Sequence, residues 1–111
     1  MAPRVKSGVH LAYWVYMLRC ENNALYTGYS DDFNKRYKAH CAGRAAKYTR
    51  SFKPIAVAQV WRVFIDKSIA MKIEIYIKGL SRQQKETLIT EPERLVNLFG
   101  REFVCVERAQ S

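Results

Sequence analysis

Two short runs of aromatic and β-branched residues near the start of the chain constrain its fold more than any other feature. Residues 11–19 are rich in tyrosine, tryptophan and valine, a composition typical of a buried β-strand. Residues 21–23 (Glu-Asn-Asn) form a polar turn cluster, and residues 25–29 have the composition of a second short strand. Because so short a polar turn joins them, we expect the two strands to form a hairpin.

A helix and a third strand are expected after the hairpin. Residues 30–32 (Ser-Asp-Asp) supply N-cap chemistry, and aromatic residues then recur at helical spacing as far as Cys41. Gly43 is a natural helix stop. Residues 43–54 predict a basic loop, and residues 55–65 are again β-branched and aromatic, which predicts a strand.

The segment around residue 74 supports two readings. Residues 72–78 (Lys-Ile-Glu-Ile-Tyr-Ile-Lys) alternate strictly, which favours a strand. Ala70, Ile73, Ile77 and Leu80 also fall on one face of a helix. Periodicity alone favours the strand.

Two capping-box patterns predict short helices in the last third of the chain. They are Ser81 with Gln84, before a helix over residues 81–89, and Thr90 with Glu93, before a helix that ends near Gly100. Residues 103–106 predict a terminal strand. Since the chain contains no internal repeat or linker, we expect one α+β domain.

Composition excludes two broad classes of protein. Hydrophobic residues make up 49% of the 111-residue chain and charged residues 26%, as in ordinary globular domains and unlike a disordered chain. No apolar run approaches the roughly 20 residues of a membrane-spanning helix, and no signal-peptide cleavage site is identified. We therefore expect a cytoplasmic protein with no membrane partner.

Positive charge is concentrated in one segment of this strongly basic chain. The formal net charge is +9, and residues 1–54 hold ten Lys and Arg against three acids. Residues 35–53 contain seven basic residues, no acid, and three aromatic residues among them. This composition is typical of a surface that contacts a phosphate backbone. The alternatives are an anionic membrane surface, an acidic protein, or a solvated face without a partner.

A group of polar side chains gathers around the predicted hairpin and helix. Tyr26, Gly28 and the tyrosines of the first strand could line one edge, because residues two apart on a strand share a face. Arg36 and His40 are four apart and therefore neighbours on one helical face. The alternative is that Arg36 is an ordinary surface charge and His40 a structural histidine.

Five short pieces of the sequence, taken in order, resemble a known family. They are residues 15–20 (Val-Tyr-Met-Leu-Arg-Cys), 25–28 (Leu-Tyr-Thr-Gly), Lys35-Arg36 with His40, 46–50 (Ala-Lys-Tyr-Thr-Arg) and 77–82 (Ile-Lys-Gly-Leu-Ser-Arg). Together with Glu74 they resemble the GIY-YIG nuclease family, and within it the small stand-alone single-domain branch. The likeness covers roughly residues 12–89, and Trp14 stands where the family has its first glycine.

The resemblance implies a fold and a division of the chain. The fold is a small three-stranded antiparallel sheet flanked by helices, with strands near residues 12–19, 25–30 and 56–65. It also implies a helix around Glu74, against the reading from periodicity. The likeness delimits a nuclease domain at 12–89. The polar residues before it, which include Pro3 and Gly8, predict a flexible leader at residues 1–11, and we expect a C-terminal helix and tail at 90–111 that pack on the same domain.

The resemblance also implies catalytic roles for five side chains. Tyr16 and Tyr26 are the motif tyrosines, one of which would deprotonate or orient the attacking water. Arg36 would stabilise charge developing on the scissile phosphate. Glu74 would hold a single Mg²⁺ or Mn²⁺, and His40 would position the water or a phosphate.

Substrate contacts are expected from a second set of residues. The resemblance implies that Gly28 lets the backbone approach the substrate without a side chain in the way. The basic segment would bind the substrate through Lys35, Lys47, Tyr48 and Arg50.

The residues around Glu74 bear on its role independently. A carboxylate flanked by isoleucines is costly to desolvate unless a cation or a partner meets it. The alternatives are a solvent-facing residue on a strand, or an ion pair with Lys78.

The resemblance, together with the basic segment, implies a metal-dependent endonuclease that hydrolyses phosphodiester bonds, with DNA more fitting than RNA, in DNA repair or processing. The alternative is a nucleic-acid-binding module that keeps the nuclease fold and the basic surface but cleaves poorly or not at all.

Overall fold

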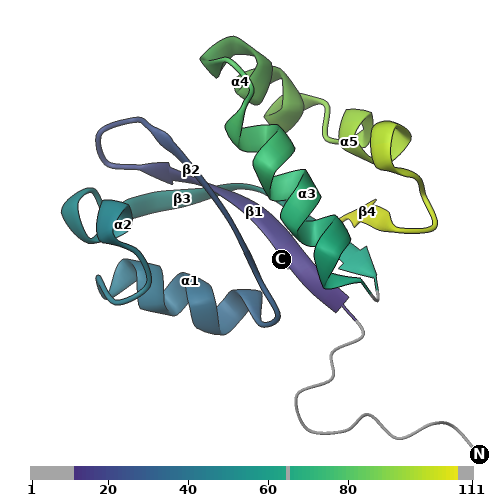
Figure 1. The fold of residues 1–111 in the computed structure, drawn as a ribbon. Coiled ribbons are helices and arrows are strands. Elements are labelled where there is room, and N and C mark those ends of the chain that lie inside the picture. Colours follow the sequence, from purple (N-terminus) through teal and green to yellow (C-terminus); the bar gives the residue numbers. More distant parts are fainter. Residues whose placement is uncertain (1–11, 65, 108–111) are drawn as a thin grey trace, which may run out of the picture.

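An antiparallel sheet of four strands lies at the centre of the structure, in the order β2-β1-β3-β4 (Figure 1). The computed structural model describes residues 12–64 and 66–107, so the predicted leader at residues 1–11 lies outside the described part. The strands are β1 (Ala12–Cys20), β2 (Leu25–Ser30), β3 (Pro54–Phe64) and β4 (Val104–Val106). β1 and β2 form the predicted hairpin.

The sheet has one strand more than the family resemblance implies. β4 is the strand that the residues at 103–106 predict, and it pairs with Trp61–Val63 along the outer edge of β3. Pairing there buries Val104 completely, which favours adding this short strand to the sheet. The α+β class and the antiparallel sheet flanked by helices are therefore confirmed, whereas the expected number of three strands is wrong.

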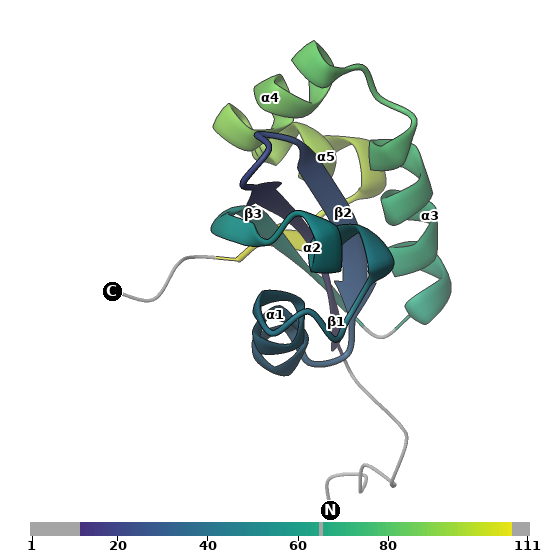
Figure 2. The ribbon, with the colours of Figure 1, turned by 90° about the vertical axis from the view of Figure 1, so that its left-hand side faces the viewer.

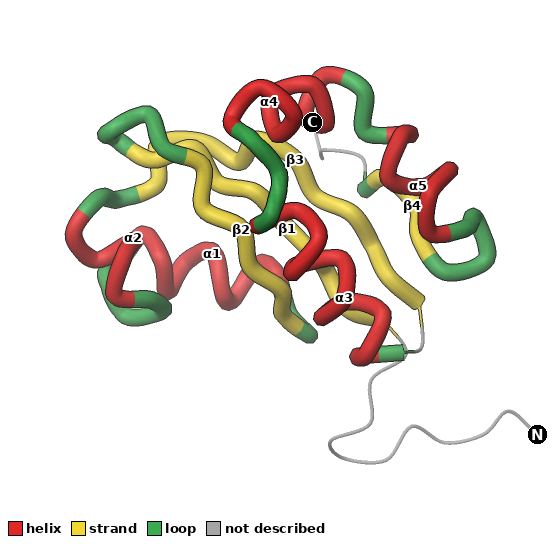
Figure 3. The backbone as a smooth tube through the Cα atoms, turned by 45° about the horizontal axis from the view of Figure 1, so that its top comes forward, coloured by secondary structure: helices red, strands yellow, loops and turns green. Residues whose placement is uncertain are grey.

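Within the described residues, five helices cover the two faces of the sheet (Figures 1 and 2). They are α1 (Phe33–Cys41) and α2 (Lys47–Ser51) on one face, and α3 (Lys67–Lys78), α4 (Arg82–Thr90) and α5 (Glu93–Phe99) on the other. Figure 3 shows α3 lying along the sheet, where it contacts β1 and β2. None of the described helices is long and apolar enough to cross a bilayer.

Alternation along β1 divides the buried residues into two clusters. Val15 and Met17 face α3, α4 and α5 and belong to the larger cluster, which also contains Trp61. Tyr16 and Leu18 point the other way, toward α1, and belong to a smaller, largely aromatic cluster. A motif tyrosine is therefore part of a packed core, which restricts how far its ring can move.

The start and end of α1 follow the predicted chemistry. Asp32 is the N-cap, and its carboxylate accepts a hydrogen bond from the backbone N–H of Lys35 at 3.1 Å. The helix ends at Cys41, and Gly43 follows with a φ of 77°, which glycine adopts at no steric cost. The interval predicted as a loop, residues 43–54, contains the short helix α2. The fully buried Thr49 ties α2 to the rest of the molecule, so this part of the prediction is wrong.

The isoleucine-rich segment around Glu74 is helical, so the strand reading from periodicity is wrong. Ile73 and Ile77 are fully buried against the sheet, whereas Ile75 between them is 66% exposed. In a strand these three side chains would point to the same face. Packing of the Ala70, Ile73 and Ile77 stripe against the sheet therefore decides the conformation.

The two predicted capping boxes have different outcomes. Ser81 and Gln84 form both reciprocal hydrogen bonds at the start of α4. Thr90 caps nothing. Its hydroxyl donates to the carbonyl of Thr87 within α4, and α5 begins at Glu93 directly after a proline.

A pair of substitutions tests the orientation of α3. We expect Ile77→Ala to lower the free energy of unfolding by about 2–5 kcal/mol, because it leaves a cavity in the core. Ile75→Ala removes an exposed side chain of the same size and should change it by no more than about 0.5 kcal/mol. Urea unfolding followed by circular dichroism measures both. Equal losses would contradict the helix.

Candidate active site

A polar cleft of about 520 Å³ lies at β2, the edge strand opposite β4. Side chains reach it from the hairpin, from α1 on one face of the sheet and from α3 on the other. Five of the residues predicted for the site line this one cleft: Tyr16, Tyr26, Gly28, Arg36 and Glu74. The fold therefore brings together residues that are up to 58 positions apart in the sequence.

Tyr16 occupies its position because its partner across the hairpin is a glycine. Tyr16 and Gly28 are directly opposed in the β1–β2 register. A Cβ atom at Gly28 would lie 2.6 Å from the hydroxyl oxygen of Tyr16 and 2.8 Å from the adjacent ring carbon. Gly28 thus leaves space for the phenol ring, a function that the reasoning from sequence did not include.

His40 lies behind Tyr16 rather than on the wall of the cleft. It is 1% exposed, and its Nε2 atom is 2.9 Å from the hydroxyl oxygen of Tyr16. Its Nδ1 atom is 2.7 Å from the hydroxyl oxygen of Thr49. Both ring nitrogens therefore have protein partners, which differs from the expectation that His40 contacts water or phosphate.

Burial sets the protonation states of Tyr16, Tyr26 and His40. It raises the pKa of Tyr16 well above its ordinary value, an effect that the neighbouring Tyr26 increases and Arg36 opposes. Burial likewise raises the pKa of Tyr26, with a smaller contribution from Glu74. Burial, aided by the charge of Arg36, lowers the pKa of His40 to about 4. Near neutral pH both phenols are protonated and the imidazole is uncharged.

Arg36 and Glu74 bring opposite charges to the cleft from opposite faces of the sheet. Arg36 is an exposed residue of α1, and the side chain of Glu74 on α3 is 18% exposed. Glu74 also forms an ion pair of 3.4 Å with Lys78, so the predicted alternative partner is present. Because Lys78 is half exposed, this pair contributes little energy and does not prevent Glu74 from binding a cation.

The donor set of the cleft suits a hard divalent cation held mainly by water and substrate. No group of three or more histidine, cysteine or acidic side chains suited to a metal is found among the described residues. Mg²⁺ keeps several waters and commonly takes only one or two protein carboxylates together with phosphate oxygens. Glu74, on the wall of a polar cleft, fits that requirement.

Family comparison agrees with this geometry. The sequence matches the GIY-YIG catalytic domain over residues 12–87. The chain belongs to the GIY-YIG family. The predicted resemblance is thereby confirmed.

The relatives of this GIY-YIG chain are small proteins. It is 41% identical over 88 residues to the UPF0213 protein FN1575 of Fusobacterium nucleatum, with 78% of this chain and 85% of that protein covered. It is 40% identical over 88 residues to the UPF0213 protein YhbQ of Salmonella arizonae, with 79% and 87% covered. A solution NMR structure of the UPF0213 protein BH0048 from Bacillus halodurans shares 40% identity, covers 72% of this chain and 84% of that one, and has a TM-score of 0.48.

The predicted substrate-binding residues of the GIY-YIG domain lie outside the lining of the cleft. Lys47, Tyr48 and Arg50 are exposed residues of α2, and Lys35 is exposed on α1. The ring of Tyr48 stacks on that of Tyr26 with 6.5 Å between centroids. This stacking connects α2 to the wall of the cleft.

The positive charge of the segment 35–53 is not neutralised by ion pairs within the described ranges 12–64 and 66–107. Every ion pair found there uses a basic residue outside that segment: Arg19, Arg62, Lys78, Arg82, Arg94 or Arg101. The basic residues next to the GIY-YIG cleft therefore remain available to an anionic partner.

Four residues of the cleft were missed by the reasoning from sequence: Tyr29, Ser30, Asp31 and Lys67. Tyr13, which also lines the cleft, is one of the first-strand tyrosines expected at this edge. Three of the missed residues, 29–31, directly follow Gly28, so adjacency to the motif was an available signal. Lys67 stands at the start of α3 and reaches the GIY-YIG cleft only because that helix folds across the sheet.

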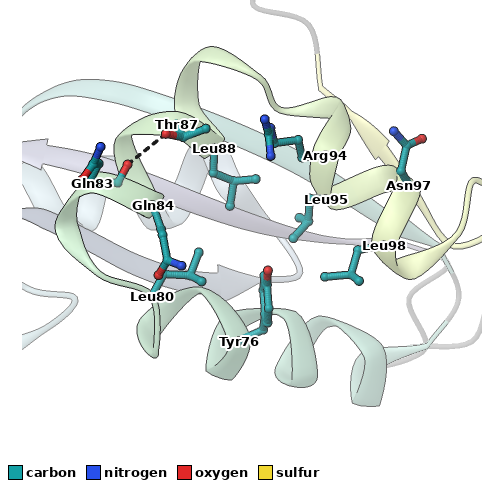
Figure 4. A pocket seen from close by; sticks show the side chains of 10 residues that line it. All are labelled: Tyr76, Leu80, Gln83, Gln84, Thr87, Leu88, Arg94, Leu95, Asn97 and Leu98. Atoms are coloured by element: carbon teal, nitrogen blue, oxygen red, sulfur yellow. Dashed lines mark hydrogen bonds between the residues drawn. The ribbon is translucent and has the colours of Figure 1, made fainter.

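A larger hollow, of about 720 Å³, lies between α3, α4 and α5 (Figure 4). Leucines and Tyr76 form much of its wall, and its polar side chains are amides, Thr87 and Arg94. No carboxylate, histidine or cysteine lines it. It therefore lacks the groups that the GIY-YIG cleft offers for acid–base chemistry or metal binding.

Substitution of Gly28 tests the packing of Tyr16. We expect Gly28→Ala to lower the free energy of unfolding by about 1–3 kcal/mol, because the added methyl group displaces a buried ring. The control is Gly79→Ala, where a Cβ atom would make an ordinary contact of 3.6 Å. Urea unfolding compares the two variants. A Gly28→Ala protein as stable as the Gly79→Ala protein would contradict the argument.

Proposed function

We propose that this chain is an endonuclease that hydrolyses phosphodiester bonds of nucleic acid, DNA in preference to RNA, with the help of a divalent cation. The observation that carries the proposal is the convergence of Tyr16, Tyr26, Arg36 and Glu74 on one polar cleft beside an uncompensated basic segment. Membership of the GIY-YIG family supports it. The proposed nuclease domain spans residues 12–89, with residues 90–111 as its C-terminal extension.

Tyr16 is the proposed general base, acting as a relay. Because its pKa is raised, the phenolate is too scarce near pH 7 to account for catalysis. Tyr16 instead accepts a proton from the attacking water while it passes its own proton to Nε2 of His40, 2.9 Å away. His40 is uncharged at that pH and has a lone pair for the proton. It acts through Tyr16 and is a positioning residue rather than a group in contact with substrate.

The water oxygen forms a bond to phosphorus as the P–O bond on the far side breaks, and the leaving oxygen takes a proton from solvent. Negative charge accumulates on the phosphate oxygens during this step. The guanidinium of Arg36, which lines the cleft, would stabilise that charge. Glu74 would hold the divalent cation, which supplies a Lewis acid for the phosphate and leaving oxygens when it is bound.

Substrate binding is proposed for the surface next to the cleft. Lys35, Lys47 and Arg50 would contact backbone phosphates, and the exposed ring of Tyr48 would lie against a sugar or base. The lack of a side chain at Gly28 would also let the substrate approach the backbone of β2. These contacts form in both the ground state and the transition state, so they act mainly on affinity.

Cleavage assays of variants test the catalytic roles. We expect Tyr16→Phe to lower the single-turnover rate by about 10²–10⁴-fold, because the relay hydroxyl is lost. Arg36→Ala and Glu74→Gln should each lower it by on the order of 10²-fold or more, with little change in affinity for nucleic acid. The assay uses labelled DNA and RNA substrates of several structures, with Mg²⁺, Mn²⁺ or EDTA.

The matched control is Tyr76→Phe, which removes a tyrosine hydroxyl from the remote hollow between the helices and should cleave at the wild-type rate. If the wild type binds nucleic acid but cleaves no substrate with either metal, the nuclease proposal is wrong. The binding-module alternative would then take its place.

The salt dependence of binding tests the substrate surface. Measured in EDTA, the affinity for DNA should fall linearly on a log–log plot against salt concentration, as phosphate contacts release counterions. Lys47→Ala and Arg50→Ala should each reduce the magnitude of the slope by about one unit. Lys85→Ala on α4 is the control and should leave the slope unchanged. An affinity that does not change with salt would refute this surface.

A further inference from the structure

A continuous series of hydrogen bonds, buried as far as Thr49, runs from the cleft to the backbone of the segment between α1 and α2. The hydroxyl oxygen of Tyr16 is 2.9 Å from Nε2 of His40, and Nδ1 of His40 is 2.7 Å from Oγ1 of Thr49. The Thr49 hydroxyl in turn donates to the carbonyl oxygen of Ala46 at 3.3 Å. Tyr16, His40 and Thr49 are each no more than 1% exposed, so the partners of both ring nitrogens of His40 are protein groups.

The direction of these bonds follows from the inventory of protons. A carbonyl oxygen only accepts, and a threonine hydroxyl has a single proton to donate. With the Thr49 proton directed to the Ala46 carbonyl, the threonine oxygen accepts from His40, and Nδ1 carries the ring proton. A neutral imidazole has only one ring proton, so Nε2 presents a lone pair to Tyr16.

The reverse arrangement, in which Thr49 donates its proton to Nδ1 of His40, would prevent the proposed proton relay. If Thr49 turned its proton toward Nδ1, Nε2 would carry the ring proton and donate it to Tyr16. The phenol proton would then point away from His40 and occupy the side from which water must approach. The Ala46 carbonyl would also lose its bond from Thr49, although it would keep the helical bond from the N–H of Arg50 at 3.0 Å.

We propose that Thr49 is a positioning residue that holds His40 in the tautomer protonated at Nδ1, so that Nε2 can accept the phenolic proton of Tyr16. As far as it concerns cleavage, this inference rests on the proposed nuclease function. The tautomer itself does not depend on that function. Burial of His40, which lowers its pKa to about 4, agrees with a neutral ring that has one proton to place.

The local fold explains how Thr49 reaches His40. Thr49 lies one turn into α2, and its hydroxyl bonds back to the residue that precedes the helix. α1 and α2 contact each other, which places the threonine against the last turn of α1, where His40 lies. α2 therefore contributes the buried Thr49 to the site as well as its exposed basic residues.

The direct test is ¹⁵N NMR of the histidine ring in the full-length protein. In a two-bond ¹H–¹⁵N spectrum the unprotonated ring nitrogen resonates far downfield of the protonated one, and His40→Gln distinguishes His40 from His10. We expect Nε2 of His40 to be the downfield nitrogen in the wild type. A wild-type ring protonated at Nε2 would overturn the proposal, whatever the variants show.

Two variants separate the hydroxyl of Thr49 from its shape. Thr49→Val keeps the shape and removes the hydroxyl, so we expect the ring proton to shift to Nε2. Thr49→Ser restores the hydroxyl and should restore the wild-type tautomer, which keeps the test decisive if the valine variant does not fold. Thr87→Val on α4, whose hydroxyl donates to the Gln83 carbonyl, is the matched control. An unchanged tautomer in folded Thr49→Val would refute the role of Thr49.

Kinetics extend the test to cleavage. We expect Thr49→Val to lower kcat by on the order of 10²-fold, the lower range for a disturbed acid–base group, with KM nearly unchanged and with rescue by Thr49→Ser. If the wild type cleaves no substrate, the nuclease function fails while the NMR result still decides on the tautomer. If the wild type cleaves and Thr49→Val matches it, only the role of Thr49 in catalysis fails.

Discussion

The pairing of Tyr16 with Gly28 across the hairpin is the constraint on which the rest of the site depends. A side chain larger than hydrogen at position 28 would collide with the phenol ring, so the β1–β2 register and the choice of glycine act together. Held in this way, Tyr16 belongs to the smaller core and also borders the cleft. The same packing directs its hydroxyl toward His40.

The two faces of the sheet make different contributions to the cleft. α1 supplies Arg36 to the cleft, and α1 and α2 together supply the exposed basic residues beside it and the buried hydrogen bonds behind Tyr16. α3, anchored in the larger core by Ile73 and Ile77, supplies the carboxylate of Glu74 and the ammonium group of Lys67. α1 and α3 reach the cleft from opposite faces of the sheet at β2. Arg36 and Glu74 can therefore face one substrate without forming a buried ion pair with each other.

Local patterns predicted most of the elements, and they failed where packing overrides them. The hairpin, the Asp32 cap, the Ser81 capping box and the fourth strand all follow from nearby residues. The segment around Glu74 does not, since its alternating isoleucines satisfy the strand period and the helix period at once. Only contact with the sheet distinguishes Ile75, which is exposed, from its buried neighbours.

The sequence by itself determined the family, the basic segment and the identity of the main cleft residues, because these depend on residue type and order along the chain. Tertiary structure alone decided which partners those residues have. It placed His40 behind Tyr16 instead of beside the substrate, put Thr49 beneath His40, and brought Lys67 to the cleft. Hydrogen-bond partners and burial depend on how separate helices and strands pack in space, and spacing along a single helix or strand carries no information about that.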